Sequence, residues 1–276
     1  MNLKSKTALA TLSLIASTAV FAQNKAPEPD YTLTYNVGAV SDYRFRGIEQ
    51  TAGGPSIQAG VDFAHKSGLY AGVFTASNIK WIKEFNGASQ GSYEVDLYGG
   101  YKSEAFGLGY DVGVITYQYP GNNSGAANTP GAGGFSKADT TEAYVGVSYS
   151  VVSLKYYQSI GDFLGNLNSN GSRYWDLSAT FDLGNGFTLT PHIGRQTVPN
   201  QNFNGNTRVA AVTNGTAADY SDYALTLAKD MGNGVVLSLA AVGTDAKDGG
   251  FYNSSFYGTN RFYGKDGLVF GLKYNF

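Results

Sequence analysis

The sequence has no cysteine and only two histidines among its 276 residues. The chain therefore forms neither disulfides nor thiolate metal sites, and two histidines argue against a zinc centre. Charged residues make up 14%, well below the usual quarter, and the net charge of −2 gives no basic field to attract nucleic acid. Beyond the first 22 residues no stretch approaches twenty consecutive apolar residues, so no transmembrane helix is predicted.

Glycine and tyrosine are the abundant residues, with 37 and 21 copies, and aromatic residues reach 14%. This apolar and aromatic content is too high for a disordered chain. Low charge combined with many tyrosines and glycines is typical of a strand-rich protein with an unusual surface.

The N-terminus reads as a targeting segment. Two lysines, Lys4 and Lys6, precede a run of apolar and small residues that ends in Val20-Phe21-Ala22. This pattern predicts a cleaved secretory signal peptide over residues 1–22 rather than the alternative, a buried N-terminal helix. Gln23 follows in place of a cysteine, which argues against a lipid-anchored mature form. Residues 23–30 are then a short polar lead-in in the periplasm, and residues 31–276 form the domain.

Residues 31–46 alternate between apolar and polar side chains for sixteen positions, far beyond the five or six of a typical soluble strand. Its aromatic residues Tyr31 and Tyr43 are twelve positions apart, about 40 Å along a strand. Tilted by about 40°, that length projects to roughly 30 Å, close to the apolar band and aromatic girdles of an outer-membrane barrel. The alternation recurs along the chain and predicts twelve strands in total, two of which, 68–77 and 234–244, are apolar on both faces.

The predicted connections are sorted by length. Short connections lie at 66–67, 103–105, 150–151, 183–186 and 231–233, and they alternate with long ones at 47–55, 78–91, 121–138, 160–171, 197–218 and 245–266. Short periplasmic turns, long outside loops and an even strand number are features of membrane barrels, whereas a soluble β-sandwich has no reason to sort its loops. The predicted fold is therefore all-β: a transmembrane antiparallel up-and-down β-barrel of about twelve strands.

The chain ends on a fully alternating strand, with Leu268, Phe270, Leu272, Tyr274 and Phe276 on one face. Such a strand is predicted to close the barrel by pairing with the first one, with Phe276 at the periplasmic interface. A C-terminal aromatic residue resembles the assembly signal of bacterial outer-membrane proteins. Barrel-assembly machinery, outer-membrane lipids and lipopolysaccharide are the partners that this location implies.

Four stretches carry a family resemblance: SDYRFRGIEQT (41–51), PSIQAGVDF (55–63), GLYAGVF (68–74) and YDVGVITYQYPG (110–121). They resemble the TorF family of proteobacterial outer-membrane porins, most specifically over residues 31–121. The resemblance implies an outer-membrane barrel that acts as a channel. It implies no particular substrate and no catalytic residues.

The polar face of the predicted strands gives the candidate pore lining. Arg44 and Arg46 on the first strand are expected at the same height as Glu94 and Glu142, an arrangement that would set a transverse field in a constriction. The alternative is that these charges pair only to avoid isolation and plug a small barrel. The candidate pore-lining residues are Asp42, Arg44, Arg46, Asp62, Glu94, Asp96, Asp111, Glu142, Lys155, Asp176 and Lys273, and the same parity also places Asp182 and Asp222 inward. Inward tyrosines at 98, 117, 144 and 157 either stack sugars or fill space.

A passive channel for ions or small hydrophilic solutes is the function that these features favour. The alternative is a non-conducting barrel that acts through its outside loops in adhesion or structure. An outer-membrane lipid enzyme ranks third, because neither His65, at a predicted turn, nor His192 has the adjacent nucleophile that such an enzyme needs. No enzyme activity, cofactor or metal site is predicted, and the sequence leaves open whether the protein is a monomer or a trimer.

Overall fold

The computed structural model describes residues 29–204, 207–210 and 213–276. The predicted signal peptide and most of the predicted lead-in lie outside the described residues. No helix in the described part of the chain is both long enough and apolar enough to cross a membrane.

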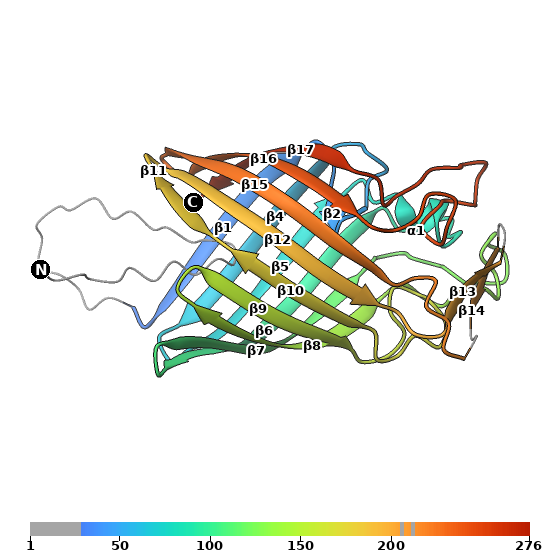
Figure 1. The fold of residues 1–276 in the computed structure, drawn as a ribbon, viewed down its shortest axis with the longest axis horizontal. Coiled ribbons are helices and arrows are strands. Elements are labelled where there is room, and N and C mark those ends of the chain that lie inside the picture. The colour runs from blue at the N-terminus through green and yellow to red at the C-terminus, as the bar shows by residue number, and fades with distance from the viewer. Residues whose placement is uncertain (1–28, 205–206, 211–212) are drawn as a thin grey trace, which may run out of the picture.

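Most of the described strands form one closed antiparallel barrel (Figure 1). Thirteen strands join in the sheet, but β10 and β11 are two parts of one wall strand interrupted at Thr180, and both pair with β12. The wall therefore has twelve strands, as predicted. They are β1 (Tyr31–Val40), β4 (Ser56–His65), β5 (Leu69–Ser77), β6 (Tyr93–Ala105), β7 (Leu108–Gln118), β8 (Thr140–Tyr149), β9 (Val152–Ser159), β10 (Arg173–Ala179) with β11 (Phe181–Gly184), β12 (Phe187–Thr197), β15 (Tyr220–Gly232), β16 (Val235–Thr244) and β17 (Gly267–Asn275).

The last strand closes the barrel on the first, which confirms the prediction for the C-terminal segment. β17 pairs with β1 in antiparallel register from Asn36↔Asn275 to Val40↔Gly271. Beyond that ladder, Tyr35 and Phe276 exchange both backbone hydrogen bonds, at 3.1 and 3.0 Å. Their rings also stack, with centroids 5.8 Å apart. The seam therefore extends to Phe276 and joins the two ends of the sheet.

The side chains of the wall alternate as the sequence pattern predicts. Large apolar residues point outward all around the barrel; on β17, for example, Leu268, Phe270 and Leu272 are 61%, 60% and 51% exposed. The intervening residues face the lumen. A surface with this many exposed apolar side chains would aggregate in water and fits a lipid environment instead.

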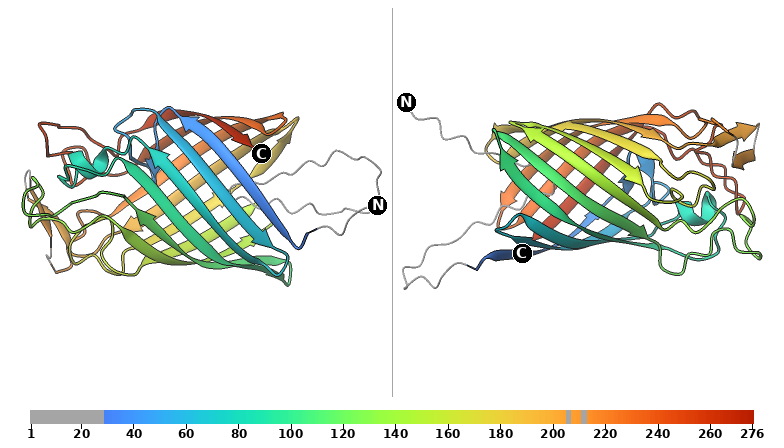
Figure 2. Two further views of the ribbon diagram at one scale, coloured as in Figure 1. Left: turned by 180° about the vertical axis from the view of Figure 1, so that it is seen from behind. Right: turned by 90° about the horizontal axis from the view of Figure 1, so that it is seen from below.

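Long and short connections lie at opposite ends of the barrel (Figure 2). Tight turns join β4 to β5, β6 to β7, β8 to β9, β11 to β12 and β15 to β16 at the end where the C-terminus lies. The six long connections, at 41–55, 78–92, 119–139, 160–172, 198–219 and 245–266, lie at the other end. They contain the short helix α1 (Trp81–Glu84), the hairpin β2 (Arg44–Phe45) and β3 (Ile48–Glu49), and the hairpin β13 (Gln201–Asn204) and β14 (Thr207–Ala210).

The first predicted strand was too long. It ends at Val40 rather than at residue 46, because the chain turns away from the wall at Ser41. The tip of the β2–β3 hairpin is formed by Arg46 and Gly47, both with positive φ, at 49° and 80°. We call residues 41–55 the inward loop, for the reason given below.

The six long connections pack together in a small hydrophobic core. All of them contribute buried apolar side chains, and none of this core is part of the lipid-facing surface. Its members include Ile48, Ile79, Trp81, Ile82, Phe85, Tyr119, Ala138, Phe163, Val198, Ala218, Phe251 and Tyr263. We call this packed assembly of the long connections the cap. It gives the loop end of the barrel a defined structure rather than a set of independent loops.

Candidate solute path and inward loop

The inward loop crosses the lumen. It leaves the wall from β1, whose neighbours are β17 and β4, and in the closed order of twelve strands the position opposite β1 is β9. Arg46 at the loop tip contacts residues on β8, β9, β10 and β12. A loop that starts on one wall and ends against the opposite wall must span the space between them.

Arg46 is held by a carboxylate, an amide and several aromatic rings. Its two terminal nitrogens donate to the two oxygens of Glu142, at 3.1 and 2.5 Å, and one also donates to Gln196 Oε1 at 2.8 Å. The guanidinium carbon lies 4.2 Å from the ring centroid of Tyr174 and 5.1 Å from that of Tyr157. Side chains of both Arg46 and Glu142 are almost fully buried. The paired fork geometry and the ring faces are what a guanidinium prefers.

A second ion network joins the inward loop to the connection 245–266. Glu49 is fully buried, and Arg261 donates to both of its oxygens, at 2.5 and 2.9 Å. Arg44 donates to Glu49 at 3.2 Å and to Asp42 at 2.5 Å. The hydrogen bonds to Glu49 raise the pKa of Arg261, and burial raises the pKa of Asp42 despite the opposing effect of Arg44. The inward loop is therefore pinned at its base as well as at its tip.

Glu94 and Asp96 form an acidic pair on the lumen face of β6. Both are buried, and Tyr43 of the inward loop donates its hydroxyl to Glu94 Oε1 at 2.8 Å. Oδ1 of Asp96 has no hydrogen-bond partner among the described residues. On the far side of the lumen, the ring of His192 lies between Asp222 at 2.9 Å and Asp176 at 3.4 Å.

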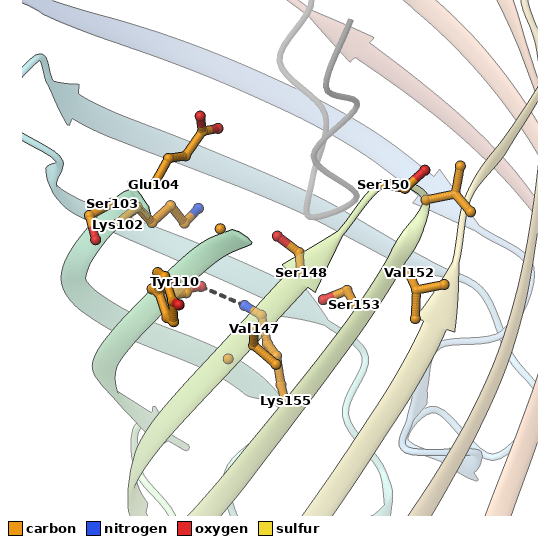
Figure 3. A pocket seen from close by; sticks show the side chains of 14 residues that line it. Lys102, Ser103, Glu104, Tyr110, Val147, Ser148, Ser150, Val152, Ser153 and Lys155 are labelled. Atoms are coloured by element: carbon orange, nitrogen blue, oxygen red, sulfur yellow. Dashed lines mark hydrogen bonds and ion pairs between the residues drawn. The ribbon is translucent and has the colours of Figure 1, made fainter. Parts of the chain in front are cut away.

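The half of the lumen near the short turns carries a separate polar network. Lys155 bonds Asp111 at 2.8 Å, and the Tyr70 hydroxyl donates to the same carboxylate at 2.5 Å. Tyr98 donates to Asp62. Around Lys155 the strands β6 to β9 border a cavity of about 170 Å³, also lined by Lys102 and Glu104 (Figure 3).

The structure brings some of the candidate residues together and separates others. Arg46 and Glu142 meet, and Lys155 meets Asp111. Arg44 does not face Glu94; it is turned towards Asp42 and Glu49. Lys273 lies on the lumen face of β17 with no ion pair to another described residue within 4 Å. Asp182 has the lumen-facing parity of its partner Thr188, but it lies exposed at a tight turn, where it accepts a hydrogen bond from the Gly184 amide at 2.8 Å.

Sequence reasoning missed several residues that hold the inward loop. Glu49 and Arg261 lie in predicted loops, and Gln196 lies at the end of a predicted strand. Glu49 lies in a connection and not in a wall strand, so its odd or even position in the sequence does not predict which way its side chain points. The one available signal is Arg46-Gly47, a pair suited to a tight turn, at the predicted end of the first strand.

Comparison with known proteins gives a family and a fold. Residues 24–276 match the model of a family described as bacterial protein of unknown function (Gcw_chp), and since the match spans most of the chain, the protein belongs to that family. A search of curated proteins found no significant match.

Two porins are among the solved structures to which this chain is similar. A KdgM porin is 5% identical and gives a TM-score of 0.50, covering 88% of this chain and 99% of that one. A NanC porin is 10% identical with a TM-score of 0.49, covering 88% and 98%. At these identities the likeness concerns the fold alone.

Proposed function

We propose that this Gcw_chp family protein is an outer-membrane channel for the passive diffusion of ions or small hydrophilic solutes, with the inward loop as its constriction. The observation that carries the proposal is the charged lumen inside an apolar outer belt, crossed by a loop that is anchored on the opposite wall. A polar interior with charged groups facing across it is how barrel channels select solutes.

The resemblance of residues 31–121 to TorF porins supports the same proposal. In this reading residues 1–22 are a signal peptide, the barrel lies among outer-membrane lipids and lipopolysaccharide after insertion by the assembly machinery, and the cap faces outward. The candidate lining residues act in two groups. Arg46 and Glu142 set the narrow part, and Asp62, Asp111, Lys155 and Lys273 line the half near the short turns.

Single-channel recording of the refolded mature barrel in a planar bilayer tests this function. Because the inward loop fills much of the cross-section, we expect small stepwise currents in the natural protein. A variant in which residues 42–54 are replaced by a short glycine-serine linker should give clearly larger steps. If the folded loop-shortened variant never conducts, the channel function is wrong.

A closed barrel that acts through its cap is the second candidate. The specific observation in its favour is the hydrophobic core shared by all six long connections, which a set of freely moving gating loops would not need. Under this alternative neither the natural protein nor the loop-shortened variant conducts in the bilayer, and the function resides in the cap surface.

A further inference from the structure

The pocket that holds Arg46 belongs to the wall and not to the inward loop. Glu142, Tyr157, Tyr174 and Gln196 come from four different wall strands, and Phe163 comes from the connection 160–172. Among the described residues that contact the guanidinium, only Phe45 is part of the loop itself, at 4.8 Å. The wall thus supplies the receptor, and the loop inserts a cationic side chain into it.

The receptor has the chemistry of a cation site. Glu142 supplies a carboxylate that accepts two hydrogen bonds, is oriented by the Tyr117 hydroxyl at 3.1 Å, and is fully buried. Gln196, also fully buried, turns its carbonyl oxygen to the cation and donates its amide to backbone carbonyls of Arg173 and Thr197. The aromatic faces complete a cage that recognises planar cations.

The surrounding charges favour cations as well. The lumen at this end carries Glu94, Asp96, Asp176 and Asp222 in addition to Glu142. Against them stand Arg46 itself and His192, which lies between Asp176 and Asp222. With Arg46 withdrawn, this region keeps an excess of carboxylates, which attracts positive solutes.

We propose that this pocket is a recognition site for solutes bearing a guanidinium group, and that Arg46 is a tethered occupant with which such a solute competes. The proposal rests on the proposed channel function and names its solute class. Because a tethered group acts at an effective concentration in the millimolar range or above, a free solute displaces Arg46 only when it is abundant at the pocket.

The test is to empty the pocket and offer it a free ligand. Arg46→Ala protein is titrated with methylguanidinium by calorimetry, beside the natural protein and Arg46→Ala/Glu142→Gln. Arg195→Ala is the matched control, because Arg195 is an exposed residue on the outer face of β12. We expect millimolar binding to Arg46→Ala, at least about tenfold weaker binding when Glu142 is also replaced, and none to the natural protein or the control.

Equal binding to Arg46→Ala and to the natural protein would overturn the inference, as would binding that ignores Glu142→Gln. If Arg46→Ala does not refold, Arg46→Gln replaces it, since the shorter side chain still donates towards Glu142 while it leaves the aromatic cage vacant. Refolding of Arg46→Ala with methylguanidinium present, but not with sodium at equal ionic strength, would count as binding.

Bilayer recordings of the same variants separate this inference from the channel function. Block of the Arg46→Ala current by methylguanidinium supports both. Binding of methylguanidinium without current in any variant would contradict the channel function and support the guanidinium site. Current in Arg46→Ala that methylguanidinium neither blocks nor alters, together with no binding, would remove the site and leave the channel.

Discussion

Gly47 shows how single residues fix the inward loop. A Cβ added there would lie 2.6 Å from Thr244 Cγ2 and 2.7 Å from Asp222 Cβ, and its φ is +80°. Gly249 has a similar φ of +72°, but nothing lies within 4 Å of its added Cβ. Comparing alanine variants at Gly47 and Gly249 therefore separates the effect of backbone strain from the effect of close packing against the wall.

We predict that Gly47→Ala destabilises the barrel more than Gly249→Ala by about 1–3 kcal/mol, because only the first adds overpacking to the strain of a left-handed residue. Thermal unfolding in detergent micelles measures the difference in midpoint. Equal midpoints for the two variants would show that the loop tip is not packed against β15 and β16.

At the scale of residues, the sequence predicted well which face of the wall a side chain takes, but poorly which side chains it contacts. Parity placed Glu94, Asp111, Glu142 and Asp176 on the lumen side, where the structure has them. Period-two patterns report which face a side chain takes, whereas its partner depends on strand stagger and on loops, which no local pattern encodes. Their role in solute passage stays a prediction.

At the scale of elements, the inward loop and the connection 245–266 depend on each other. Arg261 makes the two shortest contacts to buried Glu49, while Lys265 in the same connection lies 3.7 Å from Glu49 with its side chain 48% exposed. Both connections also contribute to the cap core. Loss of the Arg261 contacts should therefore loosen the cap before the wall.

We predict that Arg261→Ala lowers the free energy of unfolding of the cap by about 1–2 kcal/mol. Two hydrogen bonds between charged groups would contribute more than this in a fully buried site, but the partial exposure of Arg261 screens them. Trp81 is buried in the cap, and the only other tryptophan, Trp175, faces outward. In a Trp175→Phe background, Trp81 fluorescence should shift at lower denaturant in Arg261→Ala. Lys265→Ala is the control and should behave like the parent; identical curves for all three would contradict the coupling.

The strands were largely predictable and the first loop was not. Alternation located ten of the twelve wall strands, because a strand with lipid on one side and a polar lumen on the other must alternate; 68–77 and 234–244 are apolar on both faces. The same rule extended the first strand through Arg46, since the hairpin β2–β3 happens to continue the alternation of apolar and polar residues. Its departure at Ser41 depends on contacts with distant residues such as Thr51 and Glu94, which accept from Tyr43.

For the whole molecule, the separation of an apolar outside from a polar inside is the organising property. β15 carries both faces at mid-strand, with Leu225 outward and 49% exposed and Thr226 turned towards the lumen. Thr226 is opposite Thr190 and Ala240, both of which have small side chains. Substitutions at these two neighbouring positions therefore test which face of the strand contacts lipid and which faces the polar lumen.

We predict that Leu225→Arg destabilises the barrel in lipid vesicles by about 2–4 kcal/mol, because a charged side chain on the lipid face near mid-membrane must leave water. Thr226→Arg should change stability far less, since its guanidinium enters a polar lumen. Reversible denaturant unfolding in vesicles measures both. In detergent micelles, where water reaches the apolar outer surface more easily, the difference in stability between the two variants should be smaller. If Thr226→Arg were the more damaging of the two, the faces of this barrel would be assigned the wrong way round, and the charged groups now placed in a solute path would meet lipid instead.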